Sequence, residues 1–279
     1  MIIDGKKIAF QVKEELKKNI SSLSIKPQLA IIMVGNDEAS AIYVRKKQET
    51  ATEIGMSAKL FHLSENTSQN KIISLIKKLN KDKETNGIIV QLPLPENLDT
   101  NEIINSISPL KDVDGFHPYN TGLMQNNQKP FFIAATPLGI MHLLEKINVN
   151  FQGKNVVIIG ASIIVGRPLA TLLLNKECTV TITHKYTKNL SQITQNADIV
   201  IAACGVAKLV KKDWIKEGAI LIDVGIKRQN NKICGDIDFE DVKDKCDAIT
   251  PVPGGVGPMT VVMLLQNTYN AYISQNDYI

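Results

Sequence analysis

Three polar residues in one segment have side chains that could bind a substrate and move a proton. Ser40, Tyr43 and Lys47 are spaced three and four residues apart within 38–54, so a helix would place them on one face. A lysine acts as a general acid or base near neutral pH only if its pKa falls from about 10.4, through burial or a nearby positive charge. The spacing leaves open the alternative that Lys47, the last of three consecutive basic residues, belongs to a solvated basic face.

An amide and two carboxylates occupy turn-like segments further along. Gln91 directly follows the apolar run 87–90, which prolines then terminate. Open α/β sheets bind ligands at the carboxyl ends of their strands, so Gln91 could face a ligand; the alternative is that it caps loose backbone. Asp112 and Asp114 lie in a turn that suits ligand binding and ordinary Asx turns equally.

A glycine turn at 160–166 follows the apolar run 155–159 and precedes a helical pattern. In such a turn, backbone N–H groups and the helix dipole can hold a pyrophosphate. Its glycines, Gly160 and Gly166, do not have the G-x-G-x-x-G spacing, so a plain tight turn is the alternative.

Basic residues stand near this turn where NAD-binding folds place an acid. His184 and Lys185 follow the strand-like run 179–183, and Arg167 comes directly after the turn. A carboxylate at the end of that strand would repel the additional phosphate of NADP, whereas basic groups can pair with it. The pattern therefore favours NADP, and a solvated basic loop is the alternative.

Length and composition exclude several classes of protein. The 279 residues are enough for two domains, and 44% hydrophobic with 22% charged residues is typical of a globular chain. A net charge of +4 is too small for a surface that coats nucleic acid. The four cysteines contain no Cys-x-x-Cys pair, which argues against a disulfide framework or a metal site.

We expect no export signal and no membrane span. The first residues carry acid and base instead of an apolar stretch, and glycines, an arginine and a proline interrupt the apolar segment 156–174. The expected protein is therefore cytoplasmic, binds no metal and has neither nucleic acid nor a membrane as a partner.

The first half of the chain alternates apolar runs with helical patterns. Strands are expected at 29–34 and 87–90, with helices at 38–54 and 64–79 between them. Strand–helix–strand order predicts a parallel sheet.

The second half has the layout of a nucleotide-binding α/β domain. A polar stretch at 120–129 marks the expected domain crossing, a helix is expected at 140–147, and a last helix at 259–272 could return to the first domain. The four expected strands of this half are 155–159, 179–183, 199–203 and 219–224.

Six segments occur in a fixed order over nearly the whole chain. They are Ala39-Ser40-x-x-Tyr43-Val44-x-x-Lys47, Val90-Gln91-Leu92-Pro93-Leu94-Pro95, Lys111-Asp112-Val113-Asp114-Gly115, Ala135-Thr136-Pro137, the turn 160–168, and the proline- and glycine-rich segment 250–260. Together they resemble the bifunctional methylenetetrahydrofolate dehydrogenase/cyclohydrolase family.

The resemblance implies an α/β protein with two domains. An N-terminal α/β folate-binding domain, 1–133, would be joined by a C-terminal helix, 259–279, and a Rossmann-like NADP-binding domain would span 134–258. The active site would lie in the cleft between the domains of a homodimer. The implied activity is oxidation of 5,10-methylenetetrahydrofolate with NADP, followed by hydrolysis of 5,10-methenyltetrahydrofolate to 10-formyltetrahydrofolate.

The same resemblance assigns roles to residues. It makes Lys47 the catalytic lysine, Gln91 the partner that tunes it, Tyr43 a residue that packs on the pterin, and Asp114 the carboxylate that holds the pterin. The remaining residues that it assigns are Ser40, Pro253, Gly254 and Gly255 for the folate, and Gly160, Ala161, Ser162, Gly166, Arg167, His184, Lys185, Gly225 and Ile226 for the cofactor.

Two other functions remain open. A shikimate dehydrogenase also pairs a catalytic lysine with a Rossmann domain, but it would not need the proline- and glycine-rich loop 253–258. A module that binds NADP without catalysis would need neither Lys47 nor Gln91. Measuring cofactor reduction with methylenetetrahydrofolate separates these two functions from the bifunctional enzyme that the resemblance implies.

Overall fold

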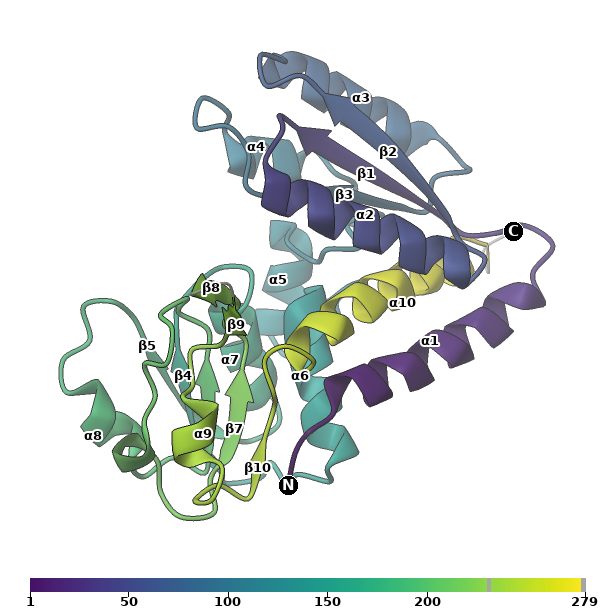
Figure 1. Ribbon diagram of the computed structural model, residues 1–279. Coiled ribbons are helices and arrows are strands. Elements are labelled where there is room, and N and C mark those ends of the chain that lie inside the picture. The colour runs from purple at the N-terminus through teal and green to yellow at the C-terminus, as the bar shows by residue number, and fades with distance from the viewer. Residues whose placement is uncertain (230–231, 277–279) are drawn as a thin grey trace. The chain divides into compact units, whose positions relative to one another are not determined.

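The computed structural model describes residues 1–229 and 232–276, which fold into two compact units (Figure 1). The five-stranded unit contains Met1–Phe10 and Thr136–Thr260, and the three-stranded unit contains Gln11–Ala135 and the chain from Val261 onward. Residues 277–279 of the expected C-terminal segment lie outside the described residues.

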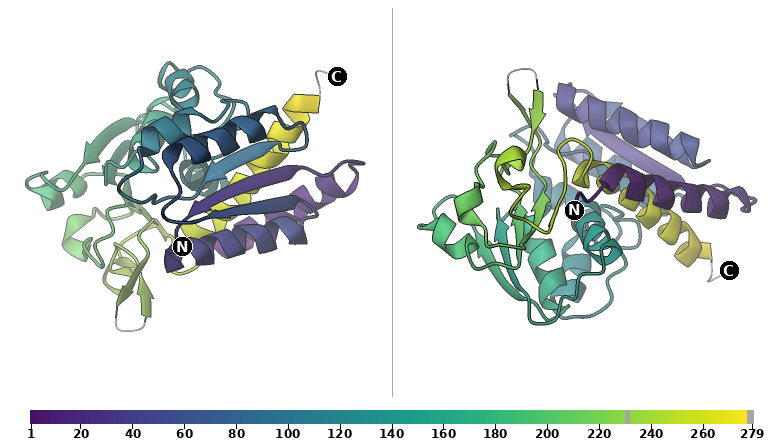
Figure 2. Two further views of the ribbon diagram at one scale, coloured as in Figure 1. Left: turned by 90° about the horizontal axis from the view of Figure 1, so that it is seen from above. Right: turned by 60° about the horizontal axis from the view of Figure 1, so that its bottom comes forward.

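The three-stranded unit is built on a parallel sheet in the order β2-β1-β3. Its strands are β1 (Gln28–Val34), β2 (Ser57–Leu63) and β3 (Gly87–Val90), with helices α2 (Glu38–Glu53) and α3 (Gln69–Lys81) in the crossovers. Because β2 and β3 flank β1 on opposite sides, right-handed crossovers place α2 and α3 on opposite faces of the sheet (Figures 1 and 2).

Apolar side chains from α3 and from both inner strands form the core of this unit. Ile72 and Ile76 of α3 pack with Ile32 and Ile88, all of them fully buried. This one-sided stripe is the reason that the segment forms an amphipathic helix. The helix begins at Gln69 instead of residue 64, because Ser68 supplies its extended N-cap.

Strand β2 was not expected from the sequence. It lies at the edge of the sheet, with most of its residues exposed or half-buried, and it includes Lys59 and His62. An edge strand lacks the continuous apolar run by which buried parallel strands are recognised.

Four further helices are present, of which only the last was expected from the sequence. These are α1 (Gly5–Ser21), α4 (Thr100–Asn105), α5 (Pro118–Gln125) and α10 (Val256–Asn276). Helix α5 occupies much of the polar stretch 120–129 in which a domain crossing was expected. His117 caps it through its side chain, and a proline begins it. The last helix extends the expected 259–272 at both ends.

The five-stranded unit has an all-parallel sheet in the order β10-β7-β6-β4-β5. Its strands are β4 (Asn155–Ile159), β5 (Thr179–Thr183), β6 (Ile199–Ala202), β7 (Ile220–Asp223) and β10 (Ala248–Ile249). The chain reverses its direction of travel between β4 and β6, and such a switch point is where open α/β sheets bind nucleotides.

Short helices and a hairpin complete this unit. They are α6 (Ala135–Lys146), α7 (Gly166–Leu174), α8 (Leu190–Thr194), the 3₁₀ helix η1 (Lys212–Trp214), the antiparallel pair β8 (Lys227–Gln229) and β9 (Lys232–Cys234), and α9 (Phe239–Val242). The core includes Val157, Val200 and Leu221 from three adjacent strands. The parallel α/β layout predicted for this half is confirmed.

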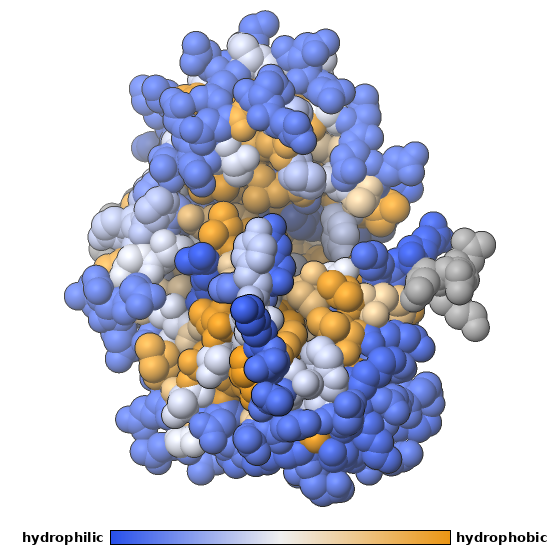
Figure 3. All heavy atoms as spheres, turned by 90° about the vertical axis from the view of Figure 1, so that its left-hand side faces the viewer, coloured by the Kyte–Doolittle hydropathy of each residue, from blue (hydrophilic) through white to orange (hydrophobic). Residues whose placement is uncertain are grey.

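Hydrophilic residues occupy much of the face drawn in Figure 3, with smaller groups of hydrophobic residues among them. In the described part of the chain, no helix is both long enough and apolar enough to cross a membrane.

A buried lysine, Lys111, binds the carbonyl groups at the C-terminal end of helix α3, and its substitution tests how much this contact stabilises the fold. The Lys111 ammonium group donates to the carbonyl oxygens of Leu79 (3.0 Å) and Asp82 (2.6 Å), and the residue is only 8% exposed. Because charged donors are worth about 1.5–3 kcal/mol at such positions, we expect Lys111→Met to lower the free energy of unfolding by about that amount. Urea denaturation measures it, with Lys77→Met on the exposed face of α3 as the control; equal losses in both variants would contradict the assignment.

Candidate functional site

The structure brings Lys47 and Gln91 together. The Asp37 side chain accepts a hydrogen bond from the backbone N–H of Ser40 and so starts α2. Two turns after Ser40 on the same face, the Lys47 Nζ atom donates to Gln91 Oε1 at 3.0 Å. Gln91 is fixed in turn, because its Nε2 atom donates to the Leu92 carbonyl oxygen at 2.8 Å. The amide therefore presents its oxygen to the lysine.

Lys47 and Asp114 have environments suited to proton transfer. Burial lowers the pKa of Lys47, and the negative charge of Asp114 opposes that shift. Burial also raises the pKa of Asp114, opposed by Lys47. A lysine whose pKa is lowered in this way spends more time as the neutral amine, the form that can accept a proton.

The turn that carries Asp114 is held from two sides. Gly115 has a φ of +70°, and a Cβ atom there would lie 2.5 Å from the backbone nitrogen of Ala134, so only glycine fits. From α10, the Asn267 side chain donates to the carbonyl oxygens of Val113 and Ile133, both at 2.8 Å. The backbone on both sides of Asp114 is therefore fixed, by close packing at Gly115 and by the hydrogen bonds of Asn267.

Ser40 and Tyr43 share the helix face of Lys47 but differ in exposure. Ser40 is 5% exposed, and its hydroxyl group lies 3.5 Å from the Leu92 carbonyl oxygen. Tyr43 is 38% exposed. Tyr43 is thus open to a ligand, whereas Ser40 contacts the segment that follows Gln91.

Asp112, which the sequence pattern left undecided, is a buried support of the same turn. Its carboxylate accepts from the backbone N–H groups of Phe116 (3.2 Å) and His117 (2.8 Å) and from Asn120 Nδ2 (2.9 Å). Burial raises its pKa to about 7; the three hydrogen bonds oppose the shift, and the charge of Asp114 adds to it.

This raised pKa predicts how stability depends on pH. Between pH about 4, where an unfolded aspartate titrates, and about 7, the folded state holds a proton on Asp112 that the unfolded state has released. The free energy of unfolding should therefore fall as the pH rises through that window. Asp112→Asn should flatten this slope, and the stability lost with the changed hydrogen bonds should be largest at the acid end of the window, where Asp112 is protonated in the wild type.

Urea denaturation at several pH values between 4 and 8 measures the effect. Asp213→Asn removes a carboxylate from an exposed position of the other unit and should keep the slope of the wild type. A slope unchanged by Asp112→Asn would show that the carboxyl group does not titrate in this window.

In the five-stranded unit, the glycine turn has the close backbone packing expected of a phosphate loop. Helix α7 begins at Gly166, and a Cβ atom at that position would overlap the carbonyl oxygen of Gly160. Gly160 has a φ of +122°, and a Cβ atom there would overlap the carbonyl oxygen of Ala203, which follows β6. The turn thus packs against the next loop at the switch point of the sheet.

Side chains of the turn support its shape. The Ser162 hydroxyl oxygen accepts from the backbone N–H groups of Val165 (3.2 Å) and Gly166 (3.4 Å). The Arg167 Nε atom donates to the Ala161 carbonyl oxygen at 3.0 Å and stays exposed. The arginine therefore lies along the turn at the start of the helix.

The basic loop after β5 lies beside this turn. Gly160 donates its N–H to the carbonyl oxygen of Thr183 at 3.0 Å, one residue before His184. His184 and Lys185 are both exposed, and the Lys185 ammonium group lies 4.9 Å from the centre of the Tyr186 ring. The predicted basic group is therefore adjacent to the predicted phosphate turn.

The remaining predicted residues lie on two loops that meet in the same unit. Pro253 is exposed, whereas Gly254 and Gly255 are buried, and Gly254 accepts a hydrogen bond from the backbone N–H of Lys6. Ile226, which is 53% exposed, would be 3.7 Å from a Cβ atom at Gly257. The loop after β7 and the proline- and glycine-rich loop therefore lie together.

The predicted site residues form one group on each unit. Ser40, Tyr43, Lys47, Gln91 and Asp114 belong to the three-stranded unit, and the cofactor residues and Pro253–Gly255 belong to the five-stranded unit. That the two groups serve one cleft stays a prediction.

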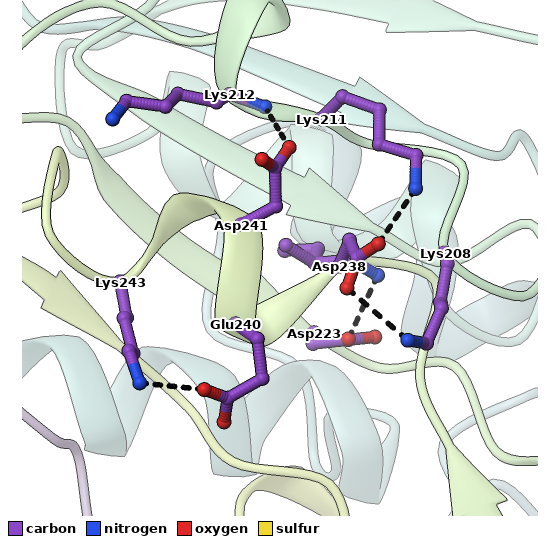
Figure 4. A network of polar contacts seen from close by, with 9 residues as sticks. Lys208, Lys211, Lys212, Asp223, Asp238, Glu240, Asp241 and Lys243 are labelled. Carbon is purple, nitrogen blue, oxygen red and sulfur yellow. Dashed lines mark hydrogen bonds and ion pairs between the residues drawn. The ribbon is translucent and has the colours of Figure 1, made fainter.

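A pocket of about 740 Å³ in the five-stranded unit was not anticipated and contains none of the predicted site residues. Beside it, Asp238 pairs with Lys208 (3.3 Å) and Lys211 (2.6 Å), and Glu240 pairs with Lys243 (Figure 4). Three of its charged side chains are therefore held in ion pairs, and a fourth, Asp223, accepts hydrogen bonds from backbone N–H groups. Its lining residues are Lys208, Asp223, Ile233, Cys234, Gly235, Ile237, Asp238, Phe239, Glu240, Pro251 and Val252.

Sequence reasoning also missed two buried carboxylates, Asp223 and Asp236. Asp223 ends strand β7, and a charge directly after a buried apolar run was the available signal. Asp236 had no comparable signal, because its partners are distant in the sequence. Among residues 1–229 and 232–276, no group of three or more His, Cys, Asp or Glu side chains could hold a metal ion.

Comparison with known proteins gives the same picture for both units. The model of the tetrahydrofolate dehydrogenase/cyclohydrolase catalytic domain matches residues 3–114, and that of the NAD(P)-binding domain of the same family matches residues 134–276. The chain is 49% identical over 276 residues to the bifunctional protein FolD of Aquifex aeolicus, covering 98% of this chain and 95% of that protein.

Solved structures agree along the full length. The crystal structure of the bifunctional enzyme FolD from Campylobacter jejuni has a TM-score of 0.96 at 47% identity and covers 98% of this chain and 99% of that one. A Trypanosoma brucei methylenetetrahydrofolate dehydrogenase-cyclohydrolase, described as complexed with NADP cofactor and inhibitor, has a TM-score of 0.94 at 35% identity, covering 98% and 97%. Both halves of the chain and their order therefore match, and the chain belongs to the tetrahydrofolate dehydrogenase/cyclohydrolase family.

Proposed function

We propose that this protein oxidises 5,10-methylenetetrahydrofolate to 5,10-methenyltetrahydrofolate with NADP and hydrolyses the product to 10-formyltetrahydrofolate. The observation that carries the proposal is the contact of Lys47 with Gln91, next to the charge of Asp114, in a chain of this family. The three-stranded unit would supply most of the folate site, and the five-stranded unit would bind the cofactor and supply Pro253, Gly254 and Gly255 to the folate.

The family match argues against a shikimate dehydrogenase, the first alternative. It covers the segments on both units, including the proline- and glycine-rich loop. The second alternative, a module that binds NADP without catalysis, gives no reason for a half-buried lysine whose amine is oriented by an amide.

The residues present fit a dinucleotide phosphate. The turn at 160–166 leaves no room for a Cβ atom at Gly166, opens a helix N-terminus, and has Arg167 and the basic loop beside it. Gly160, Ala161, Ser162 and Gly166 would hold the pyrophosphate, and the basic side chains would pair with the additional phosphate. Gly225 and Ile226 would lie by the nicotinamide. When bound, NADP accepts the hydride from the one-carbon bridge of the folate.

The second reaction needs a group that takes a proton from attacking water. Lys47 is suited to this role because its lowered pKa supplies the neutral amine, and Gln91 holds that amine in one orientation. The cationic methenyl group would disfavour a protonated lysine beside it and lower the pKa further. The Asp114 carboxylate would accept hydrogen bonds from the N–H groups of the pterin and fix its position.

We also propose that the protein is a cytoplasmic homodimer, as the family resemblance implies. Sedimentation velocity measures the state of assembly directly. A monomer at the concentrations used for activity would overturn this part of the proposal.

The direct test is cofactor reduction by the purified protein with methylenetetrahydrofolate, with formyl product assayed in parallel. Reduction of NADP together with formation of the formyl product supports both steps. Absence of both would overturn the proposed function.

Cofactor choice gives a separate prediction. Because Arg167, His184 and Lys185 surround the turn and no carboxylate ends β5, kcat/KM with NADP should exceed that with NAD by at least about tenfold, or roughly 1.4 kcal/mol. Lys185→Asp should erode this preference by charge repulsion and leave cyclohydrolase activity unchanged. Lys188→Asp, the same change on an exposed lysine three residues later, should erode it less. Equal kcat/KM values for the two cofactors in the wild type would refute the preference.

A further inference from the structure

Two carboxylates are buried together in the five-stranded unit, and neither has a role so far. Asp223 is 4% exposed and Asp236 is not exposed at all. Asp223 ends strand β7, and Asp236 follows strand β9 by two residues. Burying a carboxylate costs free energy unless hydrogen bonds compensate for the lost hydration. The hydrogen bonds of these two carboxylates therefore show which segments of the chain they hold in place.

Asp236 fixes the loop that follows β6. Its Oδ2 atom accepts hydrogen bonds from the backbone N–H groups of Cys204 (2.7 Å) and Gly205 (2.8 Å). These residues come directly after Ala203, whose carbonyl oxygen packs on Gly160 of the phosphate turn. Asp236 therefore supports the loop against which the phosphate turn packs.

Asp223 fixes the loop that follows β7 and joins it to Asp236. Its Oδ1 atom accepts from the backbone N–H groups of Gly225 (3.0 Å) and Asp236 (2.8 Å), and its Oδ2 atom accepts from that of Ile237 (2.9 Å). The backbone N–H of Asp223 itself donates to Thr250 Oγ1 at 2.7 Å. One side chain thus ties the end of β7 to the segment after β9.

Two glycines allow the carboxylates of Asp223 and Asp236 to pack closely against each other's loops, an arrangement called the interlock below. A Cβ atom at Gly225 would overlap the Asp236 carboxylate, and a Cβ atom at Gly235 would overlap the Asp223 carboxylate. Each carboxylate therefore packs against a glycine that neighbours the other one. Within the described residues, the buried Asp236 Oδ1 atom has no hydrogen-bond partner, and it lies against Gly225.

Burial beside a second carboxylate also affects the electrostatics of Asp223. Burial raises the pKa of Asp223 to about 7; its hydrogen bonds oppose the shift, and the charge of Asp236 adds to it. Burial also raises the pKa of the neighbouring Cys204 thiol to about 11, with contributions from Asp236. Cys204 is therefore a neutral thiol next to the pair.

We propose that Asp236 and Asp223 are positioning residues of the cofactor site, which hold the loops after β6 and β7 in the conformation that binds the nicotinamide half of NADP. The inference rests on the proposed function, since it places Gly225 and Ile226 beside the nicotinamide. Strands β6 and β7 are adjacent and parallel, so their carboxyl ends face the same edge of the sheet. Supports of this kind act by fixing the residues that touch the ligand.

Asp236→Ala and Asp236→Asn form the central test. The alanine variant loses the acceptor for two backbone N–H groups, whereas the asparagine variant keeps an oxygen that can accept both. We expect Asp236→Ala to raise the dissociation constant and the KM for NADP by at least about tenfold, with a smaller change in kcat. Asp236→Asn should remain within about threefold of the wild type. Calorimetric titration with NADP and dehydrogenase kinetics give these values.

The cyclohydrolase reaction separates a positioning role from a general structural one. It uses methenyltetrahydrofolate without cofactor, and Lys47 and Gln91, which would carry out its proton transfer, lie on the other unit, so Asp236→Ala should keep it within about twofold of the wild type. Gly235→Ala presses on the Asp223 carboxylate without removing any charge and should also weaken NADP binding. Asp238→Asn, which changes a carboxylate that pairs with surface lysines, should bind NADP like the wild type.

Each outcome decides the inference. NADP binding by Asp236→Ala equal to that of the wild type would overturn it, as would loss of both activities or equal weakening by the alanine and asparagine variants. A wild-type protein without dehydrogenase activity would instead overturn the proposed function. The two failures are distinguishable, because the first is seen in the variants and the second in the wild type.

Discussion

In the Lys47→Met variant, cyclohydrolase activity falls by about 10²–10⁴-fold, the typical contribution of a general acid–base group, and the methenyl intermediate accumulates. Methionine has about the length of the apolar stem of lysine but lacks the amine that contacts Gln91 at 3.0 Å. Water can still approach the methenyl carbon, but no group remains to take its proton. Dehydrogenase activity should fall less, because hydride transfer depends on alignment of two carbons.

Single-turnover measurements test this expectation. The methenyl absorbance and the formyl product are followed in parallel in the folded variant. Lys46→Met removes the neighbouring exposed lysine and should leave both activities unchanged. Formyl product released by Lys47→Met at the wild-type rate would remove Lys47 from the mechanism and leave this helix face as a solvated basic surface. If both activities fell together with a raised KM, Lys47 would also position the substrate.

In the Gly166→Ala variant, we expect the reverse pattern: loss of dehydrogenase activity with cyclohydrolase activity retained. The added Cβ atom would overlap the Gly160 carbonyl oxygen, and backbone cannot move aside as a flexible side chain can. The turn must open, so the N–H groups that would hold the pyrophosphate lose their alignment. We expect the KM for NADP to rise by at least about tenfold, equivalent to roughly 1.4 kcal/mol of binding free energy.

A second glycine provides the matched control. Gly122 lies inside helix α5, and a Cβ atom there would meet nothing within 4 Å. Gly122→Ala should leave both activities unchanged and raise the free energy of unfolding by up to about 1 kcal/mol, because alanine is the better helix former. Gly166→Ala with a wild-type KM for NADP would show that the turn does not hold the cofactor.

Elements with a regular apolar pattern were predictable, and elements at edges were not. Strands β3, β4 and β6 are buried on both faces, so their sequences are continuous apolar runs. Strand β2 was missed because an edge strand is half solvated and carries lysine and histidine. Helix α5 was missed because a turn-rich composition hid its proline start and histidine cap.

The sequence by itself determined the parallel α/β layout, the face shared by Ser40, Tyr43 and Lys47, and the strand-end place of Gln91, because periodicity and strand length are local properties. Only the tertiary structure decided the pKa of Lys47, the support of Asp114 from α10 and the interlock of Asp223 with Asp236. Burial depends on every element packed around a group, and these partners lie up to about 150 residues apart in the sequence. A charge or hydrogen bond that joins distant segments has no periodic signal, since its free energy depends on distance and desolvation in the folded chain.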